Sequence, residues 1–186
     1  MKKIALLAMT AAAAIATPAM AQQAVTGQIT LTGTVGTKCY VGSDTSVNTF
    51  SDAVDFLALD ATDGTLRAGL ATDFGTRSFT VKCNSGNPGL SITATPLATG
   101  AAAAPGYDNS IDYSATLTVD KATGGTTAVT DLTSAAGATT GSVGSPLANS
   151  AANVRITTTG YATGAATDLL VAGTYNGLIT VVISPN

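Results

Sequence analysis

The sequence predicts an all-β chain folded as a two-layer β-sandwich, and three observations carry this prediction. Several short runs alternate between apolar and polar side chains, which is the period of two expected of a half-buried strand. Gly, Asn, Asp and Pro separate these runs, as they do in turns between strands. Thr, Ala, Gly and Val dominate the composition, which favours strands joined by turns over long helices.

Residues 1–21 are expected to be a cleaved export signal. Two lysines are followed by an apolar run at 4–15 and by Ala-Met-Ala at 19–21, a small-x-small cleavage site. The mature chain then consists of an N-terminal extension at 22–35 and one domain at 36–186. No later apolar run approaches the roughly 18 residues of a membrane span, so we expect an exported product that is soluble or assembled at the cell surface.

Residues 24–39 alternate as a strand with one apolar face and one face of Thr and Gln. The apolar face carries Val25, Gly27, Ile29, Leu31, Gly33 and Val35. No hairpin turn joins this run to a second alternating run before Cys39, so the predicted strand has no neighbour in sequence. Glycine weakens a strand interior and is usually kept where another chain comes close, and Gly27 and Gly33 both lie on the apolar face. We therefore expect another part of a protein to bury this face.

The next segments are mixed. Residues 50–74 show no clear period, although Asp63-Gly64 is typical of a turn. The alternating run at 78–83, the turn residues at 84–89 and the run at 90–95 predict a β-hairpin. The alanine run at 101–104 is too short to nucleate a helix and is expected to be a loop.

The clearest internal strand is predicted at 111–119, followed by a turn at 120–125 and a short returning partner at 126–132. Residues 133–152 are almost entirely small and predict a long surface loop, with short strand pieces as the open alternative. Another strand is expected at 153–160.

The last predicted strand covers residues 175–183. One face carries Tyr175, Ile179, Val181 and Ile183, and the other carries Leu178 and Val182. A strand that is apolar on both faces is typical of the centre of a sheet, not of its edge.

The two cysteines, Cys39 and Cys83, predict a disulfide because exported proteins fold in an oxidising compartment. Closing this loop would stabilise the fold by roughly 4 kcal/mol through lost chain entropy. Removing the two signal lysines would change the formal charge from −3 to −5, which argues against nucleic acid or an anionic membrane as a partner. Only 10% of residues are charged, as suits a subunit packed among copies of itself.

The composition argues against an enzyme, a cofactor and a metal site. The chain has no His, so it lacks Ser-His and Cys-His catalytic pairs and imidazole metal ligands, and its thiols are expected to be paired. Ser/Lys and paired-Asp chemistry remain open on sequence alone. The cluster Asp52, Asp55, Asp60 and Asp63 suggests turn acids more than a calcium site. Tyr107, Tyr113 and Tyr161 suggest core or subunit contacts more than a sugar platform.

A family resemblance rests on residues 27–39, which read G-x-I-x-L-x-G-x-V followed by Cys. This string resembles the N-terminal donor strand of chaperone–usher pilins. AVTGQ at 24–28, with Cys-Tyr-Val-Gly after it, is similar to major subunits of archaic Csu-type pili, a group related to spore coat U domains. Looser similarity continues at 79–84 and 172–175, whereas residues 86–168 show little.

The resemblance implies an incomplete immunoglobulin-like β-sandwich completed by a donor strand from a neighbouring subunit. It implies a groove-filling face of Val25, Gly27, Ile29, Leu31 and Gly33, and an acceptor groove beside Tyr175, Ile179, Val181 and Ile183. The Cys39–Cys83 disulfide would tie the first strand to the second. The expected product is a surface pilus, or fimbrium, for adhesion and biofilm formation, with a periplasmic chaperone, an outer-membrane usher and a tip adhesin as further partners.

Two alternatives remain open. The segment at 24–35 is, in the simpler interpretation, the first strand of its own sandwich. The protein would then be a self-complemented surface or spore-coat-like protein, without a fibre. A tip adhesin is a third interpretation, although adhesins usually carry an additional receptor-binding domain.

Overall fold

The computed structural model describes residues 28–186, and the chain divides after Thr34 into two units that are considered separately. The predicted signal and the donor-face positions Val25 and Gly27 lie outside the described residues. Residues 28–38 form no helix or strand, and the side chains of Ile29 and Leu31 are 87% and 89% exposed. A strand requires a ladder of backbone partners, and none of these residues belongs to such a ladder in the described chain, although the Lys38 carbonyl accepts a hydrogen bond from the Asn84 N–H at 3.0 Å.

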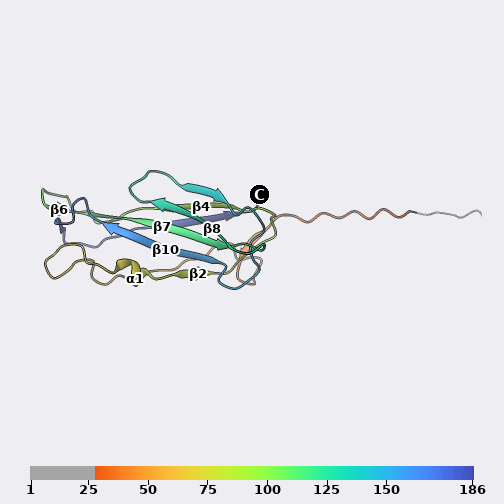
Figure 1. Ribbon diagram of the computed structural model, residues 1–186, viewed down its shortest axis with the longest axis horizontal. Helices are drawn as coiled ribbons and strands as arrows, with labels where there is room; N and C mark the ends of the chain where they lie inside the picture. The colour runs from red at the N-terminus through yellow and green to blue at the C-terminus, as the bar shows by residue number, and fades with distance from the viewer. Residues whose placement is uncertain (1–27) are drawn as a thin grey trace, which may run out of the picture. The chain divides into compact units, whose positions relative to one another are not determined.

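Residues 35–186 are nearly all β, as predicted, and form a sandwich-like fold of antiparallel sheets (Figure 1). The larger sheet contains β2 (Arg77–Phe79), β10 (Val154–Ala162), β7 (Ser110–Asp120), β8 (Thr126–Leu132) and β5 (Leu97–Ala98). The smaller sheet contains β12 (Ile179–Ser184), β4 (Gly89–Ala94) and β9 (Thr139–Ser142). The remaining elements are α1 (Leu70–Phe74), the antiparallel pair β1 (Cys39–Val41) and β3 (Val81–Cys83), and the parallel pair β6 (Tyr107–Asp108) and β11 (Leu169–Leu170).

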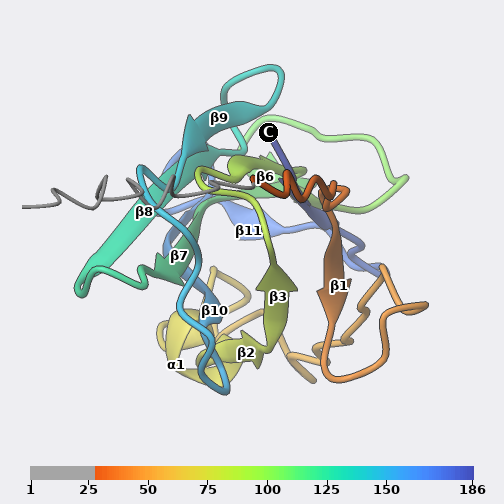
Figure 2. The ribbon, with the colours of Figure 1, turned by 90° about the vertical axis from the view of Figure 1, so that its right-hand side faces the viewer.

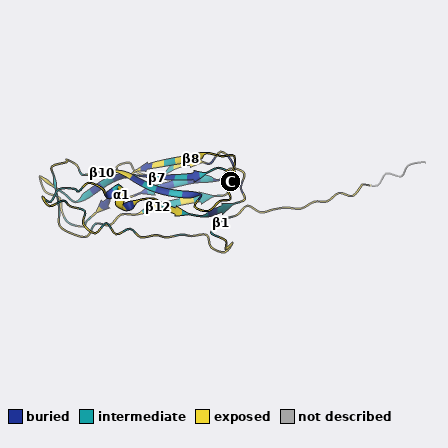
Figure 3. Cartoon of the chain, turned by 60° about the horizontal axis from the view of Figure 1, so that its bottom comes forward, coloured by how far each residue is buried: buried dark blue, intermediate teal, exposed yellow. Residues whose placement is uncertain are grey.

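The core lies between the two sheets, and β7 supplies its longest row of side chains (Figure 3). Every second residue of β7 is at most 6% exposed, which confirms the predicted strand at 111–119. These residues are Ile111, Tyr113, Ala115, Leu117 and Val119. The partner predicted at 126–132 is confirmed as β8, and the strand predicted at 153–160 is confirmed as β10.

The predicted hairpin between 78–83 and 90–95 is wrong. The first run breaks at Thr80 into β2, which pairs with β10, and β3, which pairs with β1 (Figure 2). The second run, β4, pairs with β12 and β9 instead. The chain therefore changes sheets twice within this stretch, and neighbours in sequence do not become neighbours in a sheet.

The small-residue loop predicted at 133–152 contributes more to the fold than a surface loop would. It contains β9, and it places Val143 and Leu147 in the core at 2% and 5% exposure. The short strand β9 agrees with the alternative given for this segment, a loop that contains short strand pieces.

The final strand differs from its prediction in two respects, and the first is that it begins at Ile179 and not at Tyr175. β12 pairs only with β4, so it is an edge strand within residues 28–186, although its composition predicts a central one. Leu178 and Val182, on its second face, are 63% and 52% exposed.

A disulfide joins Cys39 to Cys83, as predicted, and these residues lie opposite each other in the β1–β3 pair. None of the helices in the described part of the chain has the length and apolar character needed to cross a membrane.

Candidate functional site

The domain has a groove of about 890 Å³, which we call the side groove. Its walls are residues 50–60 on one side and residues 170–179 on the other. Its floor includes Phe74, Phe79, Leu97, Tyr113, Ile156 and Tyr161. Most of these floor residues belong to the core or pack against it, so the groove reaches the edge of the core, where Phe74, Leu97, Tyr113 and Ile156 are at most 9% exposed.

Aromatic rings make up much of the floor. The rings of Tyr113 and Tyr161 stack with centroids 5.2 Å apart, and Phe56 meets Tyr161 edge-on at 5.9 Å. Burial raises the pKa of Tyr113 to about 12 and also raises the pKa of Tyr161. Both phenols therefore remain neutral at ordinary pH, and the Tyr161 hydroxyl is within 2.8 Å of the Thr158 hydroxyl. These rings add uncharged surface to the groove, whose lining also includes Asp52, Asp55 and Arg77.

β12, which shares only Ile179 with the groove lining, leaves backbone groups unpaired. The Thr95 N–H donates to the Leu178 carbonyl at 2.9 Å, and this bond sets which residues of the strand face β4. Since backbone direction alternates along an antiparallel strand, the N–H and C=O groups of Ile179, Val181 and Ile183 point to the opposite edge. No strand of the described chain pairs with that edge. The side chains of the same three residues pack against the core.

The opposite wall also lacks backbone pairing. Within the described chain, residues 48–58 make no backbone-to-backbone hydrogen bond. Side chains attach this wall to β2: the Phe50 and Phe79 ring centroids are 4.1 Å apart, and Asp52 lies 3.6 Å from the Arg77 guanidinium. One wall therefore lacks backbone partners at residues 48–58, and the free edge of β12 begins where the other wall ends, at Ile179. The N–H groups of Leu170, Val171 and Asn176 in that second wall are already bonded within the domain.

Arg67 fixes the far part of this wall. Its guanidinium donates to the carbonyls of Phe56, at 2.9 Å, and of Ala58, and it forms an ion pair with Asp73 of 2.5 Å. These bonds hold a bend around Leu57, whose φ is 61°.

The acceptor residues expected from the resemblance occupy two positions. Tyr175 and Ile179 line the side groove, and the Tyr175 hydroxyl lies 3.0 Å from the carbonyls of both Asp108 and Val171. Val181 and Ile183 continue the same face of β12 beyond the lining. Three residues of the expected donor face, Ile29, Leu31 and Gly33, lie in the described chain. They belong to no helix or strand.

Sequence reasoning missed the aromatic floor. Phe74, Phe79 and Tyr161 of the floor and Phe56 of the wall come from four separate segments, and only the fold brings them together. Of these four, Tyr161 was expected from the sequence, as a core or subunit contact. A signal was present at 50–59, where Phe50, Val54, Phe56 and Leu59 pack against the core from an Asp-rich stretch.

The two other candidate sites do not assemble. No group of three or more acidic, His or Cys side chains able to hold a metal is found in residues 28–186. Asp52, Asp55 and Asp63 instead accept hydrogen bonds from nearby backbone N–H groups, as turn acids do. Of the three tyrosines, Tyr113 and Tyr161 lie in the groove floor, whereas Tyr107 is 48% exposed and does not line the groove.

No protein-family model, no curated protein and no solved structure matches this chain.

Proposed function

We propose that this protein is a structural subunit of a surface fibre, polymerised by inserting the N-terminal segment of one copy into the side groove of the next. The observation that carries the proposal is the unpaired edge of β12. This strand is apolar on both faces, as a central strand is, yet the described chain supplies no neighbour on one side. A sandwich that lacks one strand, as in the immunoglobulin-like pilins that this chain resembles, would explain why a strand with the composition of a central strand lies at an edge.

The N-terminal segment has the chemistry that the groove requires. Its alternation would direct Ile29 and Leu31 to the apolar floor while its backbone pairs with the free edge of β12, a binding mode known as β-augmentation. Burying each of these side chains, now 87% and 89% exposed, would contribute on the order of 1.5–3 kcal/mol. Val25, Gly27 and Gly33 complete the proposed face, with the glycines allowing close approach of the two chains.

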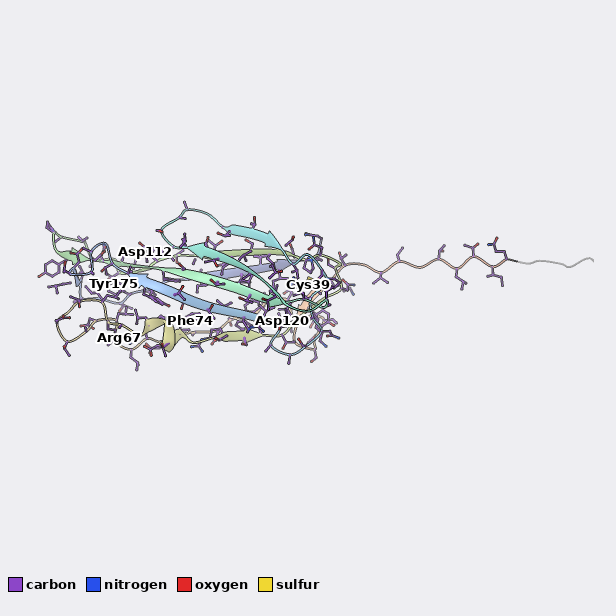
Figure 4. All side chains as sticks on the ribbon, viewed as in Figure 1. Cys39, Arg67, Phe74, Asp112, Asp120 and Tyr175 are labelled. Atoms are coloured by element: carbon purple, nitrogen blue, oxygen red, sulfur yellow. A yellow bond between two sulfur atoms is a disulfide. The ribbon has the colours of Figure 1, made fainter. Side chains whose placement is uncertain are left out.

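The ends of the domain favour exchange between copies. Cys39 and the C-terminus lie at one end, and Tyr175 lies toward the other (Figure 4). A segment leaving one copy at its Cys39 end would enter the next copy at the Tyr175 end and run antiparallel to β12. Such a contact joins two different surfaces and does not close, so it generates a fibre.

The pilin resemblance supports the remaining features of the proposal. The subunit would be exported through the periplasm, held by a chaperone that lends a strand, and assembled by an outer-membrane usher into a pilus for adhesion and biofilm formation. A tip adhesin would end the fibre. The low charge and the Thr-, Ser- and Ala-rich surface suit a subunit surrounded by copies of itself.

The test compares the two faces of the N-terminal segment. Ile29→Asp with Leu31→Asp places two charges on the apolar face, and Thr30→Asp with Thr32→Asp places the same charges on the polar face. Material sheared from cells is run unboiled on SDS gels and viewed by negative-stain electron microscopy. We expect heat-sensitive multimers and thin fibres from the unchanged protein and the polar-face variant, and neither from the apolar-face variant.

The fate of the apolar-face variant separates the two main interpretations. In the fibre interpretation it still accumulates in the periplasm with its chaperone. If it disappears even with chaperone present, or if the unchanged protein gives one band and no fibres, the segment belongs to its own sandwich and the protein is a self-complemented surface protein.

A further inference from the structure

Leu57 is the most exposed large apolar side chain of the domain, at 92%. It lies on the wall of the side groove and also borders a second hollow of about 480 Å³, so open space adjoins it on both sides. Its φ of 61° is a left-handed conformation that leucine rarely adopts and that asparagine or glycine adopts readily.

The fold holds this unfavourable arrangement in place. The Leu57 N–H donates to Asp55 Oδ1 at 2.9 Å, and Arg67 bonds the carbonyls on either side of Leu57. Neither set of bonds involves the leucine side chain, so an asparagine would satisfy the same backbone with less strain. Nothing within residues 28–186 explains a leucine here, which indicates a contact outside the single chain.

We propose that Leu57 packs against Val35 of a second copy, at the point where the inserted segment joins its own domain. This inference rests on the proposed function. Val35 is 88% exposed, and it lies beside the Cys39 end because the next residue, Gly36, accepts a hydrogen bond from Asn84 at 2.9 Å. Leu57 lies toward the other end with Arg67 (Figure 4).

Head-to-tail assembly explains why both residues are apolar. Within one chain the two residues lie toward opposite ends of the domain and cannot meet. A segment running antiparallel to β12 would bring its last residues, and Val35 with them, to the groove end that Leu57 borders. The contact would cover two exposed apolar side chains and close the groove over the inserted strand.

The experiment measures how fast SDS-resistant multimers of the full chain dissociate at a fixed elevated temperature. Leu57→Asn keeps the left-handed backbone and removes the apolar contact, and Leu57→Gly does the same without a side chain. Leu132→Asn is the matched control, because Leu132 is also exposed, at 51%, but ends β8 in the larger sheet. We expect both Leu57 variants to assemble and then dissociate about tenfold faster, the loss of a modest apolar contact.

A double-mutant cycle tests the named partner. Val35→Thr should accelerate dissociation as Leu57→Asn does, and the two changes together should add little to either alone. Multimers of the Leu57 variants that dissociate at the unchanged rate would overturn the inference, as would fully additive effects. Absence of multimers from the unchanged protein would instead overturn the proposed function.

Discussion

Asn153 shows how one side chain supports the change of sheets near Thr80. It is fully buried, and its amide substitutes for a missing strand neighbour. Its Oδ1 accepts from the Val81 N–H at 2.8 Å, while its Nδ2 donates to the carbonyls of Val81 and Ala148 at 2.7 and 2.6 Å. The backbone at the start of β3 is therefore satisfied without a ladder partner on that side.

We expect Asn153→Leu to destabilise the domain strongly. The two side chains have similar volume, but leucine leaves the buried N–H and C=O of Val81 without partners, at about 1–3 kcal/mol each, and also the carbonyl of half-buried Ala148. The melting temperature should fall by about 6–12 °C for a loss of about 3 kcal/mol in a chain of this size. Thermal unfolding followed by circular dichroism measures this, with the exposed Thr159→Ala as control. A change no larger than that of the control would contradict the role given to Asn153.

Asp120 predicts how stability responds to acid. Arg155 contacts both of its carboxylate oxygens, at 2.5 and 2.9 Å, and these hydrogen bonds lower the pKa of Asp120 below its usual 3.8. A depressed pKa means that the unfolded chain binds a proton more readily, so the contribution is present above about pH 4 and is lost as pH falls below that value.

The expected profile is flat from pH 5 to 8, since the chain has no His, and falls on the acid side. Asp120→Asn should lower stability at pH 6 by up to about 1 kcal/mol, as expected of a partly exposed pair, and leave a shallower acid limb. Urea denaturation at several pH values measures both quantities. An acid limb of unchanged slope would show that Arg155 does not act through this carboxylate.

At the scale of elements, local periodicity predicts strands better than it predicts their partners. β7 was predictable because five successive buried positions alternate without interruption. The break of 78–83 into β2 and β3 was not, because the run keeps its period while its two halves pair with β10 and β1. Pairing depends on distant segments, and a period of two contains no information about them.

The same limit explains β12. Its composition predicts a central strand, and the described chain makes it an edge strand. Under the proposed function both statements hold, because the missing neighbour comes from another copy. The prediction depended on side chains that face either side of the sheet, whereas the observed edge depends on which backbone groups find partners within one chain.

Proline substitutions along β12 separate folding from assembly. The N–H of Val181 points away from β4, so Val181→Pro removes only a hydrogen bond that an inserted strand would make. The N–H of Val182 faces β4, so Val182→Pro breaks the existing sheet. We expect Val181→Pro to accumulate as oxidised subunit that does not polymerise, and Val182→Pro to fail to accumulate.

Periplasmic extracts run on non-reducing gels report folding through the disulfide, and unboiled SDS gels report assembly. If Val181→Pro polymerises normally, the open edge of β12 is not where a neighbouring strand pairs. Loss of both variants from the periplasm would mean that β12 tolerates proline at neither position. In that case Val181→Thr, which keeps the N–H, is the variant to test, and we expect it to assemble.

At the scale of the whole molecule, the proposed donor and acceptor surfaces occupy separate parts of one chain. The proposed donor face could be inferred from the sequence because the alternation of residues and the positions of glycines are local features. The groove was not, because its floor and walls come from six stretches of sequence, including 50–60, 74–79 and 170–179. Under the proposed function, each copy would donate one segment and accept one segment in its groove, so damage to either surface would stop growth at one end only.

This separation predicts that two defective subunits stop at a dimer. The Ile29→Asp, Leu31→Asp variant keeps an intact groove, and Val181→Pro keeps an intact N-terminal segment. Expressed together with different tags, they should form a heat-sensitive heterodimer, since the intact segment enters the intact groove and neither remaining surface accepts another copy. Each variant alone should give no multimers. A self-complemented protein would give no dimer, whether the variants are expressed together or alone. A ladder of longer multimers would mean that at least one substitution leaves its surface functional.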